Sequence, residues 1–191
     1  AFYNCDSLTS VNITNIASWC NISFVGIYAN PLYYAKKLYL NGELVTNLVI
    51  PDSVTSIGSY AFEYCYKLVE VYNLSSLNIT KGSSSNGYVG YYALNIYTSL
   101  KEESKQFTTN DGFVFYVDGE TRYLLGYIGD KTEITLPESC NGYDYEIYKY
   151  AFYDCDSLTS VTIGDSVTSI GSYAFYNCDS LTSVNITNIA S

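Results

Sequence analysis

The amino-acid sequence predicts a repeat solenoid, in which short units stack and build a parallel β-sheet along one side. The stretch that begins at Ala151 recurs at a period of 23 residues, which carries Cys155 onto Cys178. The same unit is present between Leu44 and Val71, and its last part opens the chain. A unit this short has too few residues for a core of its own, so neighbouring units must bury one another's apolar sides.

Each unit reads as a strand, a turn and a compact segment. Leu158, Val161 and Ile163 belong to an L-x-x-V-x-I pattern that ends with the alternation of a strand, and we expect these three side chains to point inward. Gly164-Asp165 then turns the chain. Short helical turns are expected near the S-Y-A-F-Y-N-C segment that follows.

Two β-hairpins interrupt the repeats. Asn41-Gly42 and Asp118-Gly119 both lie between apolar alternating runs, and such pairs tolerate the positive φ of tight turns. The Gly- and Ser-rich stretch 80–87 predicts a mobile loop. The pattern over 94–107 fits either a short helix or a strand and turn.

These segments predict three parts. Residues 1–80 form the end of one repeat block, with an insertion near 15–44. Residues 81–110 form a joint, and residues 111–191 hold a hairpin and the start of the next block.

The unit L-T-S-V-T-I-G-D-S-V-T-S-I-G-S-Y-A-F-Y-N-C resembles the BspA-like leucine-rich repeats, closely over roughly 1–13, 44–72 and 133–191. This resemblance implies a right-handed coil with a parallel sheet on one side. It also implies a cell-surface or secreted protein of bacteria or some parasitic protists, with repeat arrays used in adhesion and coaggregation. The resemblance implies no enzyme and offers no fixed set of binding residues.

Composition narrows the range of possible functions. A net charge of −10 argues against nucleic acid or an anionic membrane as partner, and no apolar run approaches the roughly 20 residues of a membrane helix. The absence of His excludes a Ser-His-Asp triad, a Cys-His pair and most catalytic zinc sites. No C-x-x-C pair suggests a metal, and the Glu102-Glu103 pair is typical of a solvated surface. We therefore expect a protein that is not an enzyme and needs no cofactor or metal.

The cysteines follow the repeat. Four of them share the position after Ala-Phe-x-x, where a leucine-rich repeat places an inward-facing Asn or Cys, and Cys140 aligns with core Val54. We expect free, buried thiols. Disulfides between neighbouring coils are the alternative. The four aligned residues are Cys5, Cys65, Cys155 and Cys178, and Cys20 lies outside the series.

Five N-x-S/T sequons are expected by chance in repeats so rich in Asn, Ser and Thr, although a eukaryotic secretory protein would carry glycans there. They begin at Asn12, Asn21, Asn73, Asn78 and Asn185.

Two surfaces are candidates for interaction. Rows of Tyr flank the Ala-Phe pair of successive coils, and either they bind partners or they shield the turns. The other candidate is the outward, hydroxyl-rich side of the strands, which either bonds glycans and protein loops or only keeps the sheet soluble. The aromatic rows comprise Tyr3, Tyr60, Tyr150, Tyr153, Tyr173 and Tyr176. The outward face comprises Thr159, Ser160, Thr162, Thr182, Ser183, Asn185, Glu70 and Tyr72.

The last eighteen residues repeat the first eighteen, so Ala1 recurs as Ala174 and defines a superperiod of 173 (174 − 1). Because a solenoid cut within a repeat leaves an open edge, we expect either a longer tandem array or head-to-tail stacking of copies.

These observations leave two classes of function. The first is a surface adhesion module that binds host or cell-surface protein or glycan. The alternative is a structural protein that assembles into an extracellular filament or surface layer.

Overall fold

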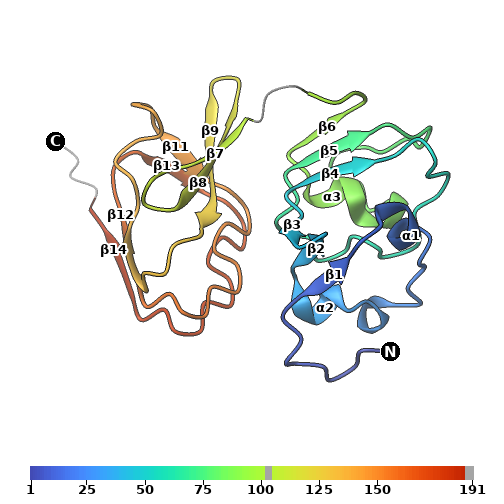
Figure 1. The fold of residues 1–191 in the computed structure, drawn as a ribbon. Coiled ribbons are helices and arrows are strands. Elements are labelled where there is room, and N and C mark those ends of the chain that lie inside the picture. The colour runs from blue at the N-terminus through green and yellow to red at the C-terminus, as the bar shows by residue number, and fades with distance from the viewer. Residues whose placement is uncertain (102–104, 188–191) are drawn as a thin grey trace. The chain divides into compact units, whose positions relative to one another are not determined.

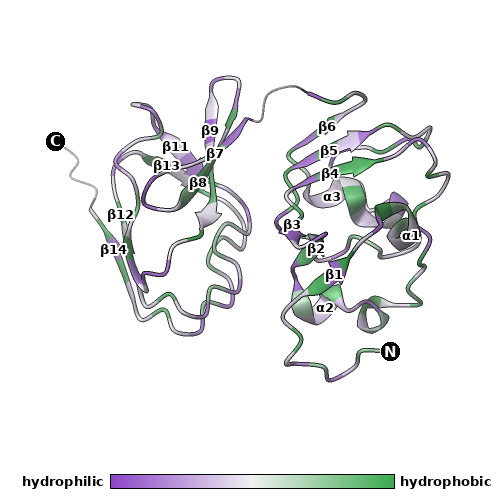
Figure 2. Cartoon of the chain, viewed as in Figure 1, coloured by the Kyte–Doolittle hydropathy of each residue, from purple (hydrophilic) through white to green (hydrophobic). Residues whose placement is uncertain are grey.

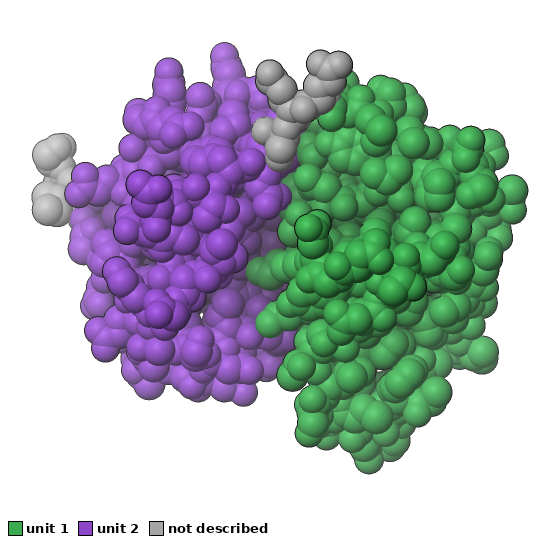
Figure 3. Space-filling view, viewed as in Figure 1, with its two compact units in different colours: residues 1–101 green, residues 102–191 purple. Residues whose placement is uncertain are grey.

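The computed structural model describes residues 1–101 and 105–187, so Glu102-Glu103 lies outside the described residues. The chain divides into two compact units, 1–101 and 102–191, which Figure 3 colours separately. The block boundaries predicted from the sequence stay predictions, as does the handedness of the coil.

The first unit carries two short sheets (Figure 1). One has the order β1-β2-β3, with β1 parallel to β2, and the other is the parallel sheet β4-β5-β6. The strands are β1 (Val11–Ile13), β2 (Leu38–Leu40), β3 (Glu43–Leu44), β4 (Asn47–Ile50), β5 (Glu70–Asn73) and β6 (Asn95–Tyr97). The helices are α1 (Ile16–Cys20), α2 (Leu32–Ala35) and α3 (Val89–Tyr92), with short 3-10 helices η1 (Ile27–Ala29) and η2 (Asn86–Tyr88).

The repeat period sets the strand register. Asn47 pairs with Glu70, an offset of 23 residues, and the inward side chains Leu48 and Ile50 are buried. The hairpin predicted at Asn41-Gly42 is confirmed, because β2 and β3 pair antiparallel around it.

The second unit has one parallel and one mixed sheet, both visible in Figure 1. The parallel sheet has the order β10-β12-β14, made of β10 (Glu133–Thr135), β12 (Ser160–Ile163) and β14 (Ser183–Ile186). The mixed sheet has the order β13-β11-β9-β8-β7, made of β13 (Val167–Ile170), β11 (Tyr145–Ile147), β9 (Thr121–Tyr127), β8 (Phe113–Asp118) and β7 (Gln106–Thr108). The second predicted hairpin is confirmed by the antiparallel pair β8–β9, but Asp118 pairs with Thr121, so the turn is Gly119-Glu120, one residue later than predicted.

Apolar side chains from both sheets form one core in the second unit. Leu158, Val161 and Ile163 are buried in it, as the repeat pattern predicts. Phe115 and Leu124 enter the same core from the hairpin. In Figure 2 the apolar residues appear as green segments along the strands.

The Ala-Phe segments form consecutive hydrogen-bonded turns rather than the helical turns expected from the sequence. The amide of Ala61 donates to the Gly58 carbonyl, and Cys65 donates to Phe62. Tyr64 lies within this segment and has a φ of 70°, a left-handed conformation that prevents a continuous helix. In the coil that contains Tyr88, the segment that follows this residue is the helix α3, and the Tyr88 ring stacks on Tyr60.

Glycine in the S-I-G part of the motif allows the coils to approach closely. A Cβ on Gly58 would collide with the backbone of Ile22, and one on Gly171 would collide with the backbone of Lys149. These contacts bring neighbouring turns together, as the bond from the Gly58 amide to the Cys20 carbonyl at 2.7 Å shows.

Within the described part of 94–107, the open alternatives resolve as strands. β6 and β7 occupy 95–97 and 106–108, and residues 98–101 form no helix. Residues 80–87 form a turn and the start of η2, and the mobility expected there stays a prediction.

The six cysteines are free thiols with different exposure. Cys20, Cys65 and Cys140 are buried, but Cys155 and Cys178 are only half-buried. The expectation of burial is wrong for Cys5, which is exposed in the coil of β1, a strand that pairs on one side only within the described residues. Of the sequons, Asn73 is buried with its side chain bonded to the Leu77 carbonyl, and the other four asparagines are exposed.

A tyrosine-lined surface as the candidate interaction site

Four tyrosines form a two-by-two cluster in the second unit. Tyr150 stacks on Tyr173 with ring centroids 5.5 Å apart and planes 4° apart, and Tyr153 stacks on Tyr176 at 5.4 Å and 16°. Within each coil the two rings meet edge to face, at 5.6 Å and 5.5 Å. The predicted rows therefore exist here, and Tyr173 and Tyr176 expose 57% and 53% of their surface.

The turn backbone fixes the spacing of these rings. Phe152 lies between the two rows, is buried, and stacks on Phe175 with planes 3° apart. The Phe152 amide donates to the Ala174 carbonyl at 2.7 Å, and the Asp154 amide donates to the Tyr176 carbonyl at 3.1 Å. Because consecutive coils have the same turn, the outward rings repeat at the coil spacing.

The first unit holds a longer aromatic surface, which we call the tyrosine chain. Nine tyrosines are linked ring to ring, from Tyr3 to Tyr60, with successive centroids between 4.8 and 6.0 Å. In order of contact they are Tyr3, Tyr28, Tyr33, Tyr64, Tyr66, Tyr92, Tyr91, Tyr88 and Tyr60. The sequence predicted its two ends and missed the seven rings between them, because these do not recur at one repeat position.

Two charged residues lie against the tyrosine chain. The Lys36 ammonium is 5.6 Å from the Tyr33 ring centroid and 5.8 Å from that of Tyr64. One carboxylate oxygen of Glu63 is buried without a hydrogen-bond partner, and burial raises the pKa of this carboxyl. Burial and then the Glu63 charge raise the pKa of the Tyr64 phenol, so the ring stays neutral at physiological pH.

The hydroxyl-rich strand face is less available than the sequence suggested. Thr159 and Thr182 donate their hydroxyls to backbone carbonyls of the preceding coil, at 3.1 and 3.3 Å. Among the remaining positions in this unit, Ser160, Thr162 and Ser183 are half-buried and Asn185 is exposed. These side chains therefore join neighbouring coils as well as facing outward.

Two residues assigned to this face are buried, which corrects the prediction. Glu70 and Tyr72 expose 1% and 8% of their surface, and the Tyr72 hydroxyl donates to a Glu70 carboxylate oxygen at 2.6 Å. The Tyr72 ring also stacks on Tyr97 at 5.4 Å. The pair satisfies its own polar groups and is not open to a partner.

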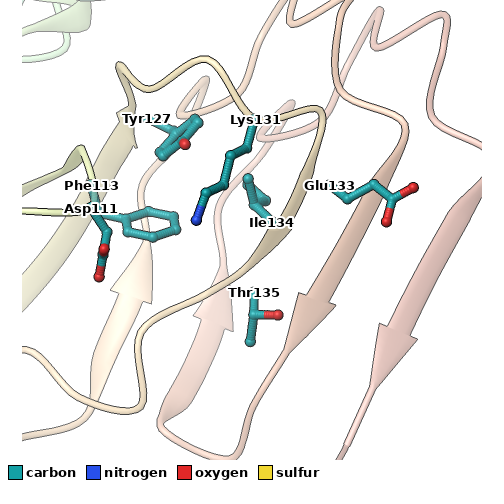
Figure 4. Close-up of a pocket in the computed structure, with 7 residues that line it drawn as sticks. All are labelled: Asp111, Phe113, Tyr127, Lys131, Glu133, Ile134 and Thr135. Carbon is teal, nitrogen blue, oxygen red and sulfur yellow. The ribbon is translucent and has the colours of Figure 1, made fainter.

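A half-open pocket of about 250 Å³ lies in the second unit (Figure 4). The residues that line it are Asp111, Phe113, Tyr127, Lys131, Glu133, Ile134 and Thr135. No motif in the sequence predicted this pocket, because its walls combine strands β8 and β9 of the hairpin with strand β10 of the repeat. Among residues 1–101 and 105–187 no group of His, Cys, Asp and Glu is placed to hold a metal ion.

The described fold is that of a leucine-rich repeat protein: stacked coils, each adding one strand to an open parallel sheet. The BspA type leucine rich repeat region matches residues 33–86 and 127–191, in 6 copies, and the chain belongs to this family. Proteins with these repeats are typically surface-associated in bacteria, and the repeats are generally not enzymes. Within the described part of the chain, no helix has the length and apolar character needed to cross a membrane.

Three solved structures are similar to parts of the chain. A leucine-rich repeat protein from Bacteroides capillosus is 30% identical over 44% of this chain and 66% of its own, with a TM-score of 0.39. The T. pallidum leucine rich repeat protein is 28% identical over 41% of this chain and 38% of its own (TM-score 0.37). A leucine rich cell surface protein from Faecalibacterium prausnitzii is 20% identical over 97% of this chain and 44% of its own (TM-score 0.41). The chain thus spans less than two thirds of each, and no curated protein matches it.

Proposed function

We propose that this chain is a non-enzymatic module of a cell-surface or secreted protein, and that it binds host or cell-surface protein or glycan through its tyrosines. In this proposal it is one unit of a longer tandem array with the 173-residue superperiod. The observation that carries the proposal is the tyrosine chain of the first unit, nine rings in continuous contact.

Exposed members make the tyrosine chain a suitable contact surface. Tyr3, Tyr28 and Tyr91 expose 69%, 46% and 40% of their surface while each ring is braced by a neighbour. Tyrosine offers a large area, a hydroxyl that donates and accepts, and little side-chain entropy to lose. A ring that is already held by its neighbours loses still less when a partner binds.

Repetition strengthens weak contacts. Only three of the nine rings, those of Tyr3, Tyr28 and Tyr91, are exposed, so the affinity of one module is expected to be weak, and several modules on one chain raise it through effective concentration. The acidic surface, with a net charge of −10, favours partners that are not polyanions.

Exposed tyrosines allow a matched test. Tyr28→Ala and Tyr91→Ala each remove a ring from the tyrosine chain, and we expect about a tenfold loss of affinity for immobilised matrix protein or mucin glycan, typical of an interface anchor. Tyr143→Ala is the control, because Tyr143 is 59% exposed and contacts Arg122 outside both clusters. Unchanged binding by the first two variants, or an equal loss in the control, would contradict the proposal.

A second candidate function is structural assembly into an extracellular filament or layer. The regular stacking of near-identical coils favours it, since β12 and β14 pair in register with Ser160 beside Ser183 and Ile163 beside Ile186. Electron microscopy of the protein at high concentration tests this candidate, which requires regular filaments or sheets.

A further inference from the structure

The pocket of Figure 4 is lined by residues of the second unit alone, from the hairpin β8–β9, strand β10 and the loop between them. Its volume of about 250 Å³ lies just below the roughly 300–1,000 Å³ of pockets that hold drug-sized ligands. It therefore has room for a ligand of about one ring. The groups that line the pocket decide which chemistry that ring must have.

Two aromatic rings form one wall of the pocket. Phe113 and Tyr127 pair across the hairpin, and their ring centroids are 4.9 Å apart with planes at 44°. Phe113 is buried in the core, whereas Tyr127 is half-buried. A Cβ on Gly129 would collide with the Tyr127 phenol, so glycine at this position leaves the space that the ring occupies. The Ile128 amide donates to the Gly112 carbonyl at 2.9 Å and holds the loop against the hairpin.

Three charged side chains also line the pocket. Asp111, Lys131 and Glu133 are exposed, and none of them forms an ion pair with another residue of 1–101 or 105–187. Their polar atoms are therefore open to a ligand, the carboxylates as acceptors and the ammonium as a donor. Two carboxylates and one ammonium give the pocket a net charge of −1.

The backbone of β10 adds further polar groups. The Leu136 amide donates to the Thr162 carbonyl at 2.9 Å, so the even-numbered positions of this strand bond to β12. Because strand residues alternate in direction, the amides and carbonyls of Glu133 and Thr135 face away from β12. In the sheets formed by the described residues, no strand pairs with that edge. Backbone donors and acceptors thus accompany the charged side chains.

This combination of groups matches a neutral sugar ring. One face of a pyranose carries C–H groups, which pack well on the electron-rich face of an aromatic ring such as that of Tyr127. Sugar hydroxyls both donate and accept, so they suit carboxylates, an ammonium and strand amides together. An acidic sugar or a phosphate would meet a pocket of charge −1 in a chain of charge −10, which is unfavourable.

We propose that this pocket binds one neutral pyranose residue of a glycan. Because the pocket is half-open, the rest of the glycan stays in solvent. A peptide strand is less well suited, since β10 offers it an edge of only three residues, Glu133–Thr135. The proposal does not rest on the tyrosine chain, because every residue that lines the pocket belongs to the second unit.

Saturation-transfer NMR of the full chain tests the proposal with simple methyl glycosides. The neutral probes are those of glucose, galactose, mannose and N-acetylglucosamine. At least one should bind with a dissociation constant on the order of 1 mM, as expected for so small a ligand. Methyl glucuronide, which carries a carboxylate, should bind about tenfold more weakly. Absence of binding by all four neutral probes, or tighter binding of the glucuronide, would overturn the proposal.

Tyr127→Ala tests the aromatic wall. It should weaken the neutral glycoside about tenfold, while Tyr143→Ala, at an exposed tyrosine that does not line the pocket, should leave binding unchanged. Tyr127 also packs against the core, so the melting temperature of each variant is measured and Tyr127→Phe provides a second comparison. The Phe variant keeps the ring and should keep most of the affinity. Equal binding by the Ala and Phe variants would contradict the assigned wall.

A change of charge tests the pocket without removing any ring. Asp111→Asn combined with Glu133→Gln changes the pocket charge from −1 to +1 at nearly constant shape. Methyl glucuronide should then bind about tenfold more tightly than to wild type. Glu138→Gln combined with Asp144→Asn is the matched control, because it changes the total charge equally at exposed positions outside the pocket. No gain in the pocket variant, or an equal gain in the control, would overturn the proposal.

Tyr28→Ala separates this site from the proposed function. Methyl glycoside binding should be unchanged in this variant, and a loss would move the sugar to the tyrosine chain and overturn the pocket assignment. If instead Tyr28→Ala and Tyr91→Ala keep full binding to matrix protein and mucin glycan, the function proposed for the tyrosine chain fails, and the pocket is judged by its own variants.

Discussion

Phe62 offers a direct measure of what stacking between coils contributes to stability. Its ring is fully buried, and its amide donates to the Gly87 carbonyl of the adjoining coil at 2.7 Å. Phe2 occupies the same repeat position in the coil that contains edge strand β1, and its ring is half-buried. The two residues are chemically identical and differ in whether coils cover both sides.

The cost of each truncation follows from burial. Phe62→Ala removes a fully buried ring and leaves a cavity, so we expect a loss of about 3–5 kcal/mol in the free energy of unfolding. Phe2→Ala removes a ring that keeps part of its surface in water, so we expect about 1–2 kcal/mol. The difference of about 2 kcal/mol measures what packing against a second neighbouring coil contributes to the free energy of unfolding.

Trp19 provides the assay, because it is the one tryptophan of the chain and reports on the first unit. It is buried, and its indole nitrogen donates to the Ala61 carbonyl at 3.0 Å. Urea titrations followed by tryptophan fluorescence, at concentrations low enough to keep the chain monomeric, give both free energies. Equal losses for the two variants would refute the reasoning that coverage from both sides decides the cost.

Three further predictions concern buried polar groups and thiols. Asn30→Ala should lower the free energy of unfolding, measured by urea titration, by about 1–3 kcal/mol. The substitution removes the side-chain amide that donates to the Tyr60 carbonyl at 2.7 Å and leaves that carbonyl unpaired. The folded state raises the pKa of Glu63, so stability should fall as pH rises from about 4.3, the ordinary glutamate value, through the raised value. Glu63→Gln should remove that slope and raise the melting temperature at neutral pH, whereas an unchanged slope would assign it to other groups. Cys5 should react with an alkylating reagent in the native state, while Cys20, whose pKa burial raises to about 11, should react only after unfolding.

The repeat period predicted the parts of the fold that depend on stacking. It places Ser160 beside Ser183 and Asn47 beside Glu70, both at an offset of 23 residues. Turn chemistry placed both hairpins to within one residue, because Asn41, Gly42 and Gly119 adopt the positive φ that a tight turn requires locally.

Features that depend on contacts across the coil were missed. Val167 and Ile170 are separated by three positions rather than two, so their segment did not read as a strand, yet it forms β13 on the mixed sheet. Glu70 and Tyr72 alternate as outward residues should, but they are buried and bonded to one another. Most of the tyrosine chain was not predicted from the sequence either, because its members come from an insertion and from repeats of unequal length.

The left-handed tyrosines have a consequence for array length. Tyr60, Tyr150 and Tyr173 adopt φ values near +60°, a conformation that is unfavourable by about 1–2 kcal/mol for a residue with a Cβ. Each coil carries this strain whether or not it has neighbours. The ring stacking that offsets it exists only between two coils, as between Tyr150 and Tyr173.

In a stack of coils that all contain this turn, the number of strained turns equals the number of coils, whereas the number of stacked interfaces is one fewer. In a nearest-neighbour model, the first coil contributes only an unfavourable free energy, and every added coil contributes one favourable stacked interface. The average stability per coil should rise with length toward a plateau, and an isolated coil should not fold. Duplication of the unit is then favoured by thermodynamics alone, before any gain in binding.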